Sequence, residues 1–132
     1  MATFHASDHR LAAHDELRIA DLAGERFISY RQGARLRELL ESAARDAGFE
    51  PEVKLVSNES RRIRRLIACG LGIAIVPRSD AQGPERELAV ARLVEPGLSR
   101  DITLGWREGR RLAPAAAEFL GLARSMFAPT HR

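Results

Sequence analysis

The chain has 132 residues, of which 45% are hydrophobic, so it is long enough to form one domain around its own core. Its net charge is only +3, and 18 acidic residues are interleaved with 21 basic ones, which argues against the one-sided basic surface of a nucleic-acid-binding domain. The single cysteine excludes an intrachain disulfide, which suits a reducing compartment. The sequence also has no apolar run of membrane-spanning length and no apolar core of a signal peptide. Together these features lead us to expect a cytoplasmic protein.

The chain opens with short elements. Thr3–Ala6 has the pattern of a strand end, and Arg18–Leu22 that of one helical turn, which stops at Gly24. Phe27–Tyr30 is predicted to be a strand, and the polar turn Arg31–Ala34 separates it from the next element.

The strongest helical pattern follows that turn. Gly48 supplies a left-handed stop, Phe49 occupies the apolar position of a Schellman motif, and Pro51 prevents the helix from resuming. The apolar residues of this helix recur on one stripe, which we expect to face the core. They are Leu36, Leu39, Leu40, Ala43, Ala44 and Ala47.

A strand and a second helix come next. Val53–Val56 is predicted to be a strand, and Ser57 or Asn58 can cap the helix that follows it. Ile63 and Ile67 share the apolar face of this helix with Leu66 and Gly70, so we expect this face to lie on the sheet.

The rest of this second helix is strongly basic. Glu59 and Arg62 are three residues apart and can pair, and Cys69 in the last turn is expected to be a buried thiol. We expect the four arginines to form a solvent face rather than a DNA reader. They are Arg61, Arg62, Arg64 and Arg65.

A third strand, Leu71–Val76, is predicted between Gly70 and Pro77. It is apolar throughout, which indicates that helices cover both of its faces, as in a parallel sheet. Strands that alternate with helices predict an α/β fold with right-handed crossovers.

The last third of the chain has two further predicted strands, Leu88–Val94 and Ile102–Trp106, then the turn Arg107–Arg110 and a helix from near Pro114. The large apolar face of that helix can cover the sheet or pack against something that this chain lacks. It contains Leu112, Ala116, Phe119, Leu120, Ala123, Met126 and Phe127.

Three motifs in register resemble the LysR-type transcriptional regulators. His9–Ala12 with Leu17–Ile28 is similar to that family's "HPLA … L-x-L-x-D-L-A-G-x-P-F-I" segment. Ala68–Pro77 resembles "A-x-G-x-G-I-A-x-x-P", and Trp106–Arg110 with Ala113–Phe119 resembles "W-R-x-G-R-x-L-S-P-A-A-x-x-F". The order and spacing hold over nearly the whole chain.

The resemblance implies a fold and a division of the chain. It implies an α/β, three-layer, Rossmann-type lobe of a periplasmic-binding-protein-like (type 2) effector domain. Residues 1–106 would form the second lobe, and residues 107–132 would be the turn and helix that return to a first lobe missing here. Arg10 and Arg26 stand where the family usually has proline, at positions that look peripheral.

The resemblance also implies a function. A small effector would bind in a cleft between the lobes and modulate transcription by shifting the population of two states. The helix N-termini and arginines of the candidate loops, not the resemblance, suggest that this effector is an anion such as a carboxylate. DNA would be contacted only through a winged helix-turn-helix that is absent from this chain, and the protein would be a homo-oligomer. The alternative is a free-standing solute-binding or protein-interaction module with no DNA partner.

Two loops and one strand end are the candidate ligand-binding residues. Backbone N–H groups at the start of the Leu36 helix would face an anion, and either arginine of the preceding loop could add a charged fork. A solvated turn is the plain alternative. This first loop contains Tyr30, Arg31, Gln32, Gly33, Ala34 and Arg35.

The second place is Asn58 and Glu59, at the start of the arginine-rich helix, where simple capping is the favoured explanation. By resemblance, Val76 and Pro77 would border the same cleft, although they can equally be a strand terminator.

Neither a catalytic constellation nor a metal site is predicted, and we expect no cofactor. The four histidines lie at the two ends of the chain without the fixed spacing of metal ligands. Gly70 and Gly72 precede a strand instead of following one, which excludes a dinucleotide-binding fingerprint.

Overall fold

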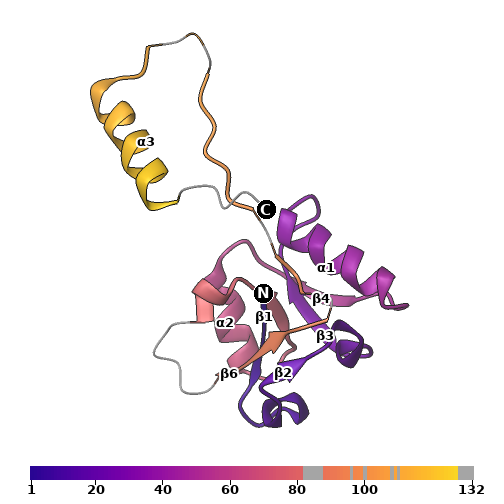
Figure 1. The fold of residues 1–132 in the computed structure, drawn as a ribbon. Coiled ribbons are helices and arrows are strands. Elements are labelled where there is room, and N and C mark those ends of the chain that lie inside the picture. The colour runs from indigo at the N-terminus through magenta and orange to yellow at the C-terminus, as the bar shows by residue number, and fades with distance from the viewer. Residues whose placement is uncertain (82–87, 96, 100, 108, 110, 128–132) are drawn as a thin grey trace. The chain divides into compact units, whose positions relative to one another are not determined.

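The computed structural model describes residues 1–81, 88–95, 97–99, 101–107, 109 and 111–127. The chain divides into two compact units, Met1–Arg100 and Asp101–Arg132. Figure 1 shows their elements. The first unit contains β1 (Ala2–Ala6), η1 (Arg10–Ala13), β2 (Glu16–Leu17), η2 (Ile19–Leu22), β3 (Arg26–Ser29), α1 (Arg35–Asp46), β4 (Glu52–Val56), α2 (Ser60–Ala68), β5 (Ala74–Val76), η3 (Arg78–Ala81) and β6 (Leu88–Leu93), and the second contains α3 (Pro114–Met126).

The strands of the first unit form a mixed sheet. Four strands are hydrogen-bonded in the order β2-β6-β1-β5, and β3 pairs in parallel with β4. A parallel bridge between Phe27 and Ile73 joins the two groups. The strands of the predicted α/β series are parallel, as expected: β3 pairs with β4, and the bridge at Ile73 is parallel to β3. The sheet as a whole is mixed, because β1 runs antiparallel to both β5 and β6. Burial of β5 on both faces follows from the helices that cover the sheet, and it does not require parallel neighbours.

The first helix follows the sequence pattern closely. Helix α1 buries its apolar stripe, including Leu40, and ends in the predicted Schellman motif. The N–H of Phe49 donates to the carbonyl of Ala44 at 2.9 Å, and the N–H of Gly48 donates to the carbonyl of Arg45 at 3.0 Å. Gly48 has a φ of +85°, which an L side chain rarely adopts.

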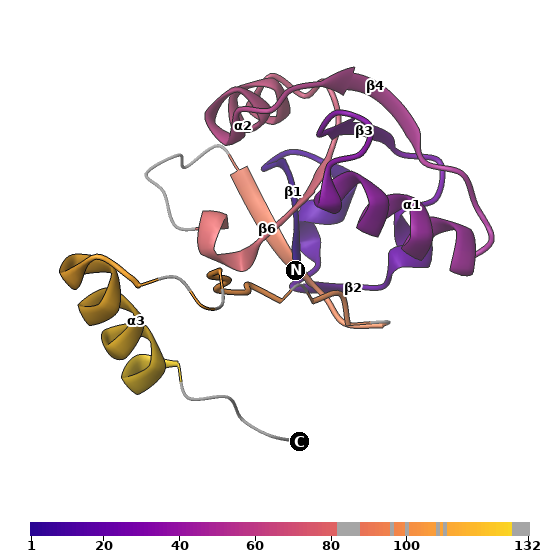
Figure 2. The ribbon, with the colours of Figure 1, turned by 90° about the horizontal axis from the view of Figure 1, so that it is seen from above.

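Two apolar clusters lie on the two faces of the sheet. On one face, Ile63 and Ile67 of α2 pack against Phe4 of β1 and are fully buried. On the other face, α1 with Leu11 of η1 and Leu22 of η2 covers the opposite side of the strands. Figure 2 shows α1 and α2 on opposite sides of the strands, so the three-layer arrangement is confirmed.

One of the four arginines of α2 does not belong to the solvent face. Arg61, Arg62 and Arg65 are exposed, but Arg64 is half-buried. Its guanidinium lies 5.2 Å from the centre of the Phe4 ring and donates a hydrogen bond to the carbonyl of Asp80. The expectation of four solvated arginines is therefore wrong for this residue.

Cys69 is exposed, so the expectation of a buried thiol is also wrong. Each residue advances about 100° around a helix, so Cys69 lies about 200° from the buried Ile67. The helix ends directly afterwards, where the N–H of Leu71 donates to the carbonyl of Leu66 at 3.2 Å.

Two predicted strands differ from the structure. The segment predicted at Leu71–Val76 is regular only from Ala74, although Ile73 forms the bridge to β3. Residues 102–106 belong to the second unit and form no strand, because a strand needs a hydrogen-bonded partner and this segment has none among the described residues.

The second unit presents an apolar hollow of about 610 Å³ between the segment around Trp106 and α3. The guanidinium of Arg124 lies 5.1 Å from the centre of the Trp106 ring. Phe119 and Phe127 line this hollow and are largely exposed, as expected for an apolar helix face without a partner. None of the helices among the described residues is long and apolar enough to cross a bilayer.

Replacement of Gly72 by alanine tests the junction between β3 and β5. A Cβ at this position would lie 2.5 Å from the carbonyl oxygen of Arg26, which already accepts the N–H of Ile73. We expect Gly72→Ala to lower the free energy of unfolding by about 1–3 kcal/mol in urea denaturation. Gly97→Ala is the matched control, because its Cβ would meet the carbonyl of Val94 at 3.8 Å, an ordinary contact. Equal stability of the two variants would contradict the packing at this junction.

A second pair of variants tests the role of Arg64. Arg64→Met keeps most of the aliphatic stem but removes both the guanidinium over Phe4 and the hydrogen bond to Asp80, so we expect a loss of about 1–2 kcal/mol. Arg61→Met removes an exposed charge from the same helix and should change stability by less than about 0.5 kcal/mol. Thermal and urea unfolding measure both values, and an equal effect of the two substitutions would disprove the buried role.

Candidate functional site

The candidate site lies where parallel strands end and helices begin. Strands β3 and β4 are parallel, and their carboxyl ends are held together by a 3.0 Å hydrogen bond from the N–H of Ser57 to the carbonyl of Ser29. Each strand leads into a helix, so the N-termini of α1 and α2 lie at the same edge of the sheet. Helix N-termini carry partial positive charge, and this edge therefore favours an anion.

The loop from β3 to α1 presents its backbone to solvent. Gln32 and Gly33 are exposed, and Gly33 adopts a φ of +78° in the turn. Ala34 occupies the N-cap position, and its side chain cannot accept a hydrogen bond from the first turn of α1. The carbonyl of Ala34 accepts the N–H groups of Arg37 and Glu38, which leaves the first N–H groups of the helix facing outward.

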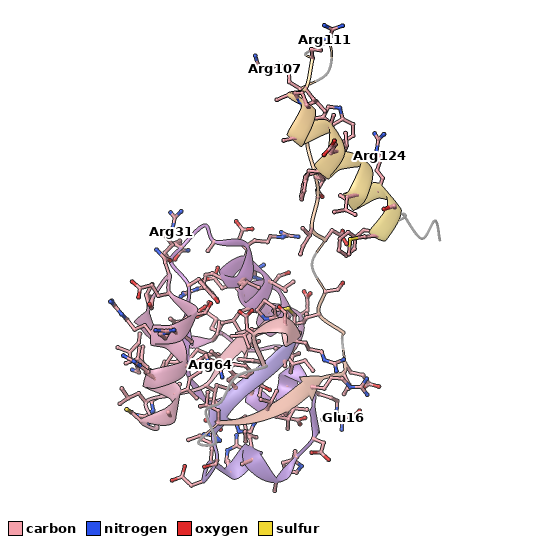
Figure 3. The ribbon with its side chains drawn as sticks, turned by 90° about the vertical axis from the view of Figure 1, so that its left-hand side faces the viewer. Glu16, Arg31, Arg64, Arg107, Arg111 and Arg124 are labelled. Carbon is pink, nitrogen blue, oxygen red and sulfur yellow. The ribbon has the colours of Figure 1, made fainter. Side chains whose placement is uncertain are left out.

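The two arginines of this loop differ in their partners. The guanidinium of Arg35 pairs with Glu38 at 3.5 Å on the exposed surface. Arg31 has no ion pair within the described part of the chain, and Figure 3 shows its side chain extending away from the body of the unit. Arg31 is therefore the arginine of this loop whose charge is available to a ligand.

The loop from β4 to α2 contacts the first loop through side chains. The hydroxyl groups of Tyr30 and Ser60 lie 3.3 Å apart, and either can donate to the other. The N–H of Arg31 donates to the Oδ1 of Asn58 at 3.4 Å. The structure thus brings together the two predicted loops, which are separated by more than twenty residues in the sequence.

The start of α2 differs from the expected cap. The N-cap residue is Glu59, whose side chain makes no capping hydrogen bond and instead pairs with Arg62 at 3.5 Å. Neither Ser57 nor Asn58 caps the helix, because Ser57 is still paired with β3 and its Oγ accepts the N–H of Glu59 at 3.2 Å. The predicted Glu59–Arg62 pair is present.

Val76 and Pro77 end β5 at the same edge of the sheet, because the bridge between Phe27 and Ile73 makes β5 parallel to β3, but their side chains do not face solvent. Both are buried, and Val76 packs with Ile63 and Phe4 in the cluster beneath α2. Their side chains support the carboxyl end of β5 instead of facing solvent. The chain then forms η3, whose Asp80 carbonyl is held by Arg64.

The sequence pattern did not lead us to expect that Arg64 links α2 to the segment after β5. A helical wheel contains the necessary signal, because Arg64 lies about 60° from the buried Ile67, whereas Arg61 and Arg65 lie on the far side. No similar signal identified the contact between Tyr30 and Ser60, which depends on the pairing of β3 with β4. Among the described residues, no group of three or more His, Cys, Asp or Glu side chains could hold a metal ion.

The comparisons with known proteins identify the family. The model of the LysR substrate binding domain matches residues 1–128. The HTH-type transcriptional regulator YybE of Bacillus subtilis is 32% identical over 117 residues, which cover 88% of this chain and 39% of that protein. The chain thus spans about two fifths of the length of this curated relative.

Two solved structures share the fold. The effector binding domain of QuiR in complex with shikimate has a TM-score of 0.82 and 24% identity, with 95% of this chain and 59% of that chain covered. The regulatory domain of Synechocystis CcmR in complex with 2-PG has a TM-score of 0.72 and 20% identity, with 98% and 63% covered. The expected α/β fold of the periplasmic-binding-protein-like (type 2) class is confirmed, and the chain belongs to the LysR substrate binding domain family.

Proposed function

We propose that this chain is the ligand-sensing part of a LysR-type transcriptional regulator and that a small carboxylate binds at the edge formed by residues 30–35 and 58–59. The family membership supports a sensor of small molecules, and the curated relatives are transcriptional regulators, which favours this function over a free-standing solute-binding module and over an enzyme. Shikimate and 2-phosphoglycolate, the ligands bound to QuiR and CcmR, are both carboxylates.

The observation that carries the proposal is the pair of helix N-termini without side-chain caps at one edge of the sheet. Unsatisfied N–H groups and the helix dipole stabilise an anion together, and each contributes most when the site excludes some of the solvent. Closure of the first lobe of the regulator over this edge would provide that exclusion. The hydrogen bonds between the two loops, Tyr30 with Ser60 and Arg31 with Asn58, favour a binding site over a simple solvated turn, which does not require such contacts.

Arg31 is the residue that we expect to recognise the carboxylate directly. Its side chain is exposed and unpaired within the described residues, and a guanidinium can bind a carboxylate with two parallel hydrogen bonds. Its backbone N–H reaches Asn58 at 3.4 Å, which is long for a hydrogen bond, so a bound anion can compete for it. Glu59 opposes an anion less strongly than its position suggests, because Arg62 pairs with it.

The proposal extends to the whole regulator. Residues 1–106 would form the second lobe, and residues 107–132 would return to a first lobe whose closure on the ligand shifts a two-state population. The regulator would act in the cytoplasm as a homo-oligomer and would contact DNA through a winged helix-turn-helix outside this chain. The exposed apolar face of α3, with Phe119 and Phe127, supports association with another protein surface.

Chemical-shift mapping of the ¹⁵N-labelled chain tests the location of the site. The probes are shikimate, 2-phosphoglycolate and citrate, added separately at millimolar concentration because one lobe alone binds weakly. We expect the amide signals of residues 31–38 and 57–62 to shift with at least one probe. The neutral methyl ester of shikimate should leave those signals unchanged, because helix N-termini favour charge.

Two variants separate a specific contact from general charge attraction. Arg31→Ala should weaken the binding of a responding probe by about tenfold, the value of one charge-assisted hydrogen bond. Arg45→Ala removes the same charge from the exposed C-terminal end of α1 and should leave the affinity unchanged. Shifts confined to other residues, no response to any of the three anions, or equal effects of the two variants would contradict the proposal.

A further inference from the structure

A buried histidine without a partner lies in the central strand of the sheet. The side chain of His5 is fully buried, and neither of its ring nitrogens makes a hydrogen bond of ordinary geometry within the described part of the chain, although the backbone of Ala6 lies near the ring. Buried polar atoms are almost always hydrogen-bonded, because an unpaired one loses its contact with water without compensation. His5 therefore requires an explanation that packing alone does not provide.

A second histidine lies directly beside it. The ring centres of His5 and His9 are 5.9 Å apart. His9 is the N-cap of η1, and its Nδ1 accepts the N–H of Leu11 at 3.3 Å. Its Nε2 lies 3.2 Å from the Oε2 of Glu25, a carboxylate that Arg10 also contacts at 2.5 Å. An Nδ1 that accepts this hydrogen bond carries no proton, so the N–H of the ring is then on Nε2, which faces Glu25.

The other elements packed against β1 bring few charges to His5. In β6, the residue opposite His5 is Ala89, and β5 contributes only apolar residues. Arg64 of α2 lies over Phe4 and therefore on the other face of the sheet. Arg78 of η3 acts on the Met1 end of the strand. Among the described residues, the charged groups that act on His5 are His9 and Glu25, in the corner between β1, η1 and β3.

We propose that His5, His9 and Glu25 form an acid-sensitive corner, which anchors β1 at neutral pH and loosens it when the two imidazoles become protonated. A proton on Nδ1 of His9 removes the acceptor for the Leu11 N–H and so releases the cap of η1. A proton on His5 places a second cation in a buried position 5.9 Å from the first. Because β1 lies between β5 and β6, its loosening weakens the centre of the sheet.

The direction of the pH dependence follows from the environment of His5. The pKa of the His5 ring is lowered from its ordinary value of 6.5, mainly because the ring is buried. The backbone of Ala6 and the carboxylate of Glu25 act to raise this pKa, whereas His9 lowers it further. The unfolded chain therefore binds a proton at this position more readily than the folded chain does. The stability linked to His5 is complete above about pH 6.5 and is lost as the pH falls below that value.

Urea unfolding of the 132-residue chain between about pH 7.5 and pH 5.5 tests the proposal. A histidine with an ordinary pKa in the unfolded state and a much lower one in the folded state raises the unfolding equilibrium constant by up to about tenfold over this range. His5→Val, which suits a strand and cannot be protonated, should remove that increase. His9→Asn keeps an acceptor for the Leu11 N–H and should prevent the acid-induced acceleration of hydrogen exchange at that amide.

His14→Asn is the matched control, because His14 is an exposed histidine at the other end of η1, and it should retain the wild-type pH dependence. NMR titration of the His5 ring in the wild-type chain provides a measurement that does not depend on the folding of a variant. A His5 midpoint at or above about 6.5 would overturn the proposal. So would a His5→Val chain that loses stability with falling pH as steeply as the wild type.

Discussion

The close approach of the backbone at Gly72 to the carbonyl of Arg26 is the contact on which the first unit depends. It allows the N–H of Ile73 to donate to that carbonyl at 2.9 Å, while the carbonyl of Ile73 accepts the N–H of Ile28 at 2.8 Å. These two bonds join the four-stranded and two-stranded parts of the sheet. Together with the packing of α2 on Phe4 and Ile28, they fix the edge that carries both candidate loops to the central strand β1. A glycine is required because any Cβ would meet the Arg26 carbonyl at 2.5 Å.

The two groups of polar residues that we assign roles to lie at opposite ends of strand β3. The carboxyl ends of β3 and β4 carry two helix N-termini and Arg31, which together favour an anion. Near the start of β3, Glu25 contacts His9 and Arg10 beside the buried His5. The proposed effector site and the proposed acid-sensitive corner therefore lie at opposite ends of one strand, and each can be tested without the other.

The sequence predicts most elements whose signals are local. The buried stripe of α1 follows from the helical period of its apolar residues. The end of the helix follows from Gly48, which adopts the left-handed conformation, and from Phe49 after it. The direction of β1 could not be predicted in this way, because the pairing of distant strands is not encoded in their alternation. Likewise, the candidate loops were predicted, but the contact between Tyr30 and Ser60 depends on register. Cys69 was misjudged because its neighbours in sequence are apolar while its helical face is not.

A crystal structure of the chain grown with 2-phosphoglycolate would show whether the edge formed by the two loops binds a carboxylate, as we propose. We expect an anion within hydrogen-bond distance of the first N–H groups of α1 and of the Arg31 guanidinium. An anion bound elsewhere on the first unit, with both helix N-termini contacting only water, would contradict it.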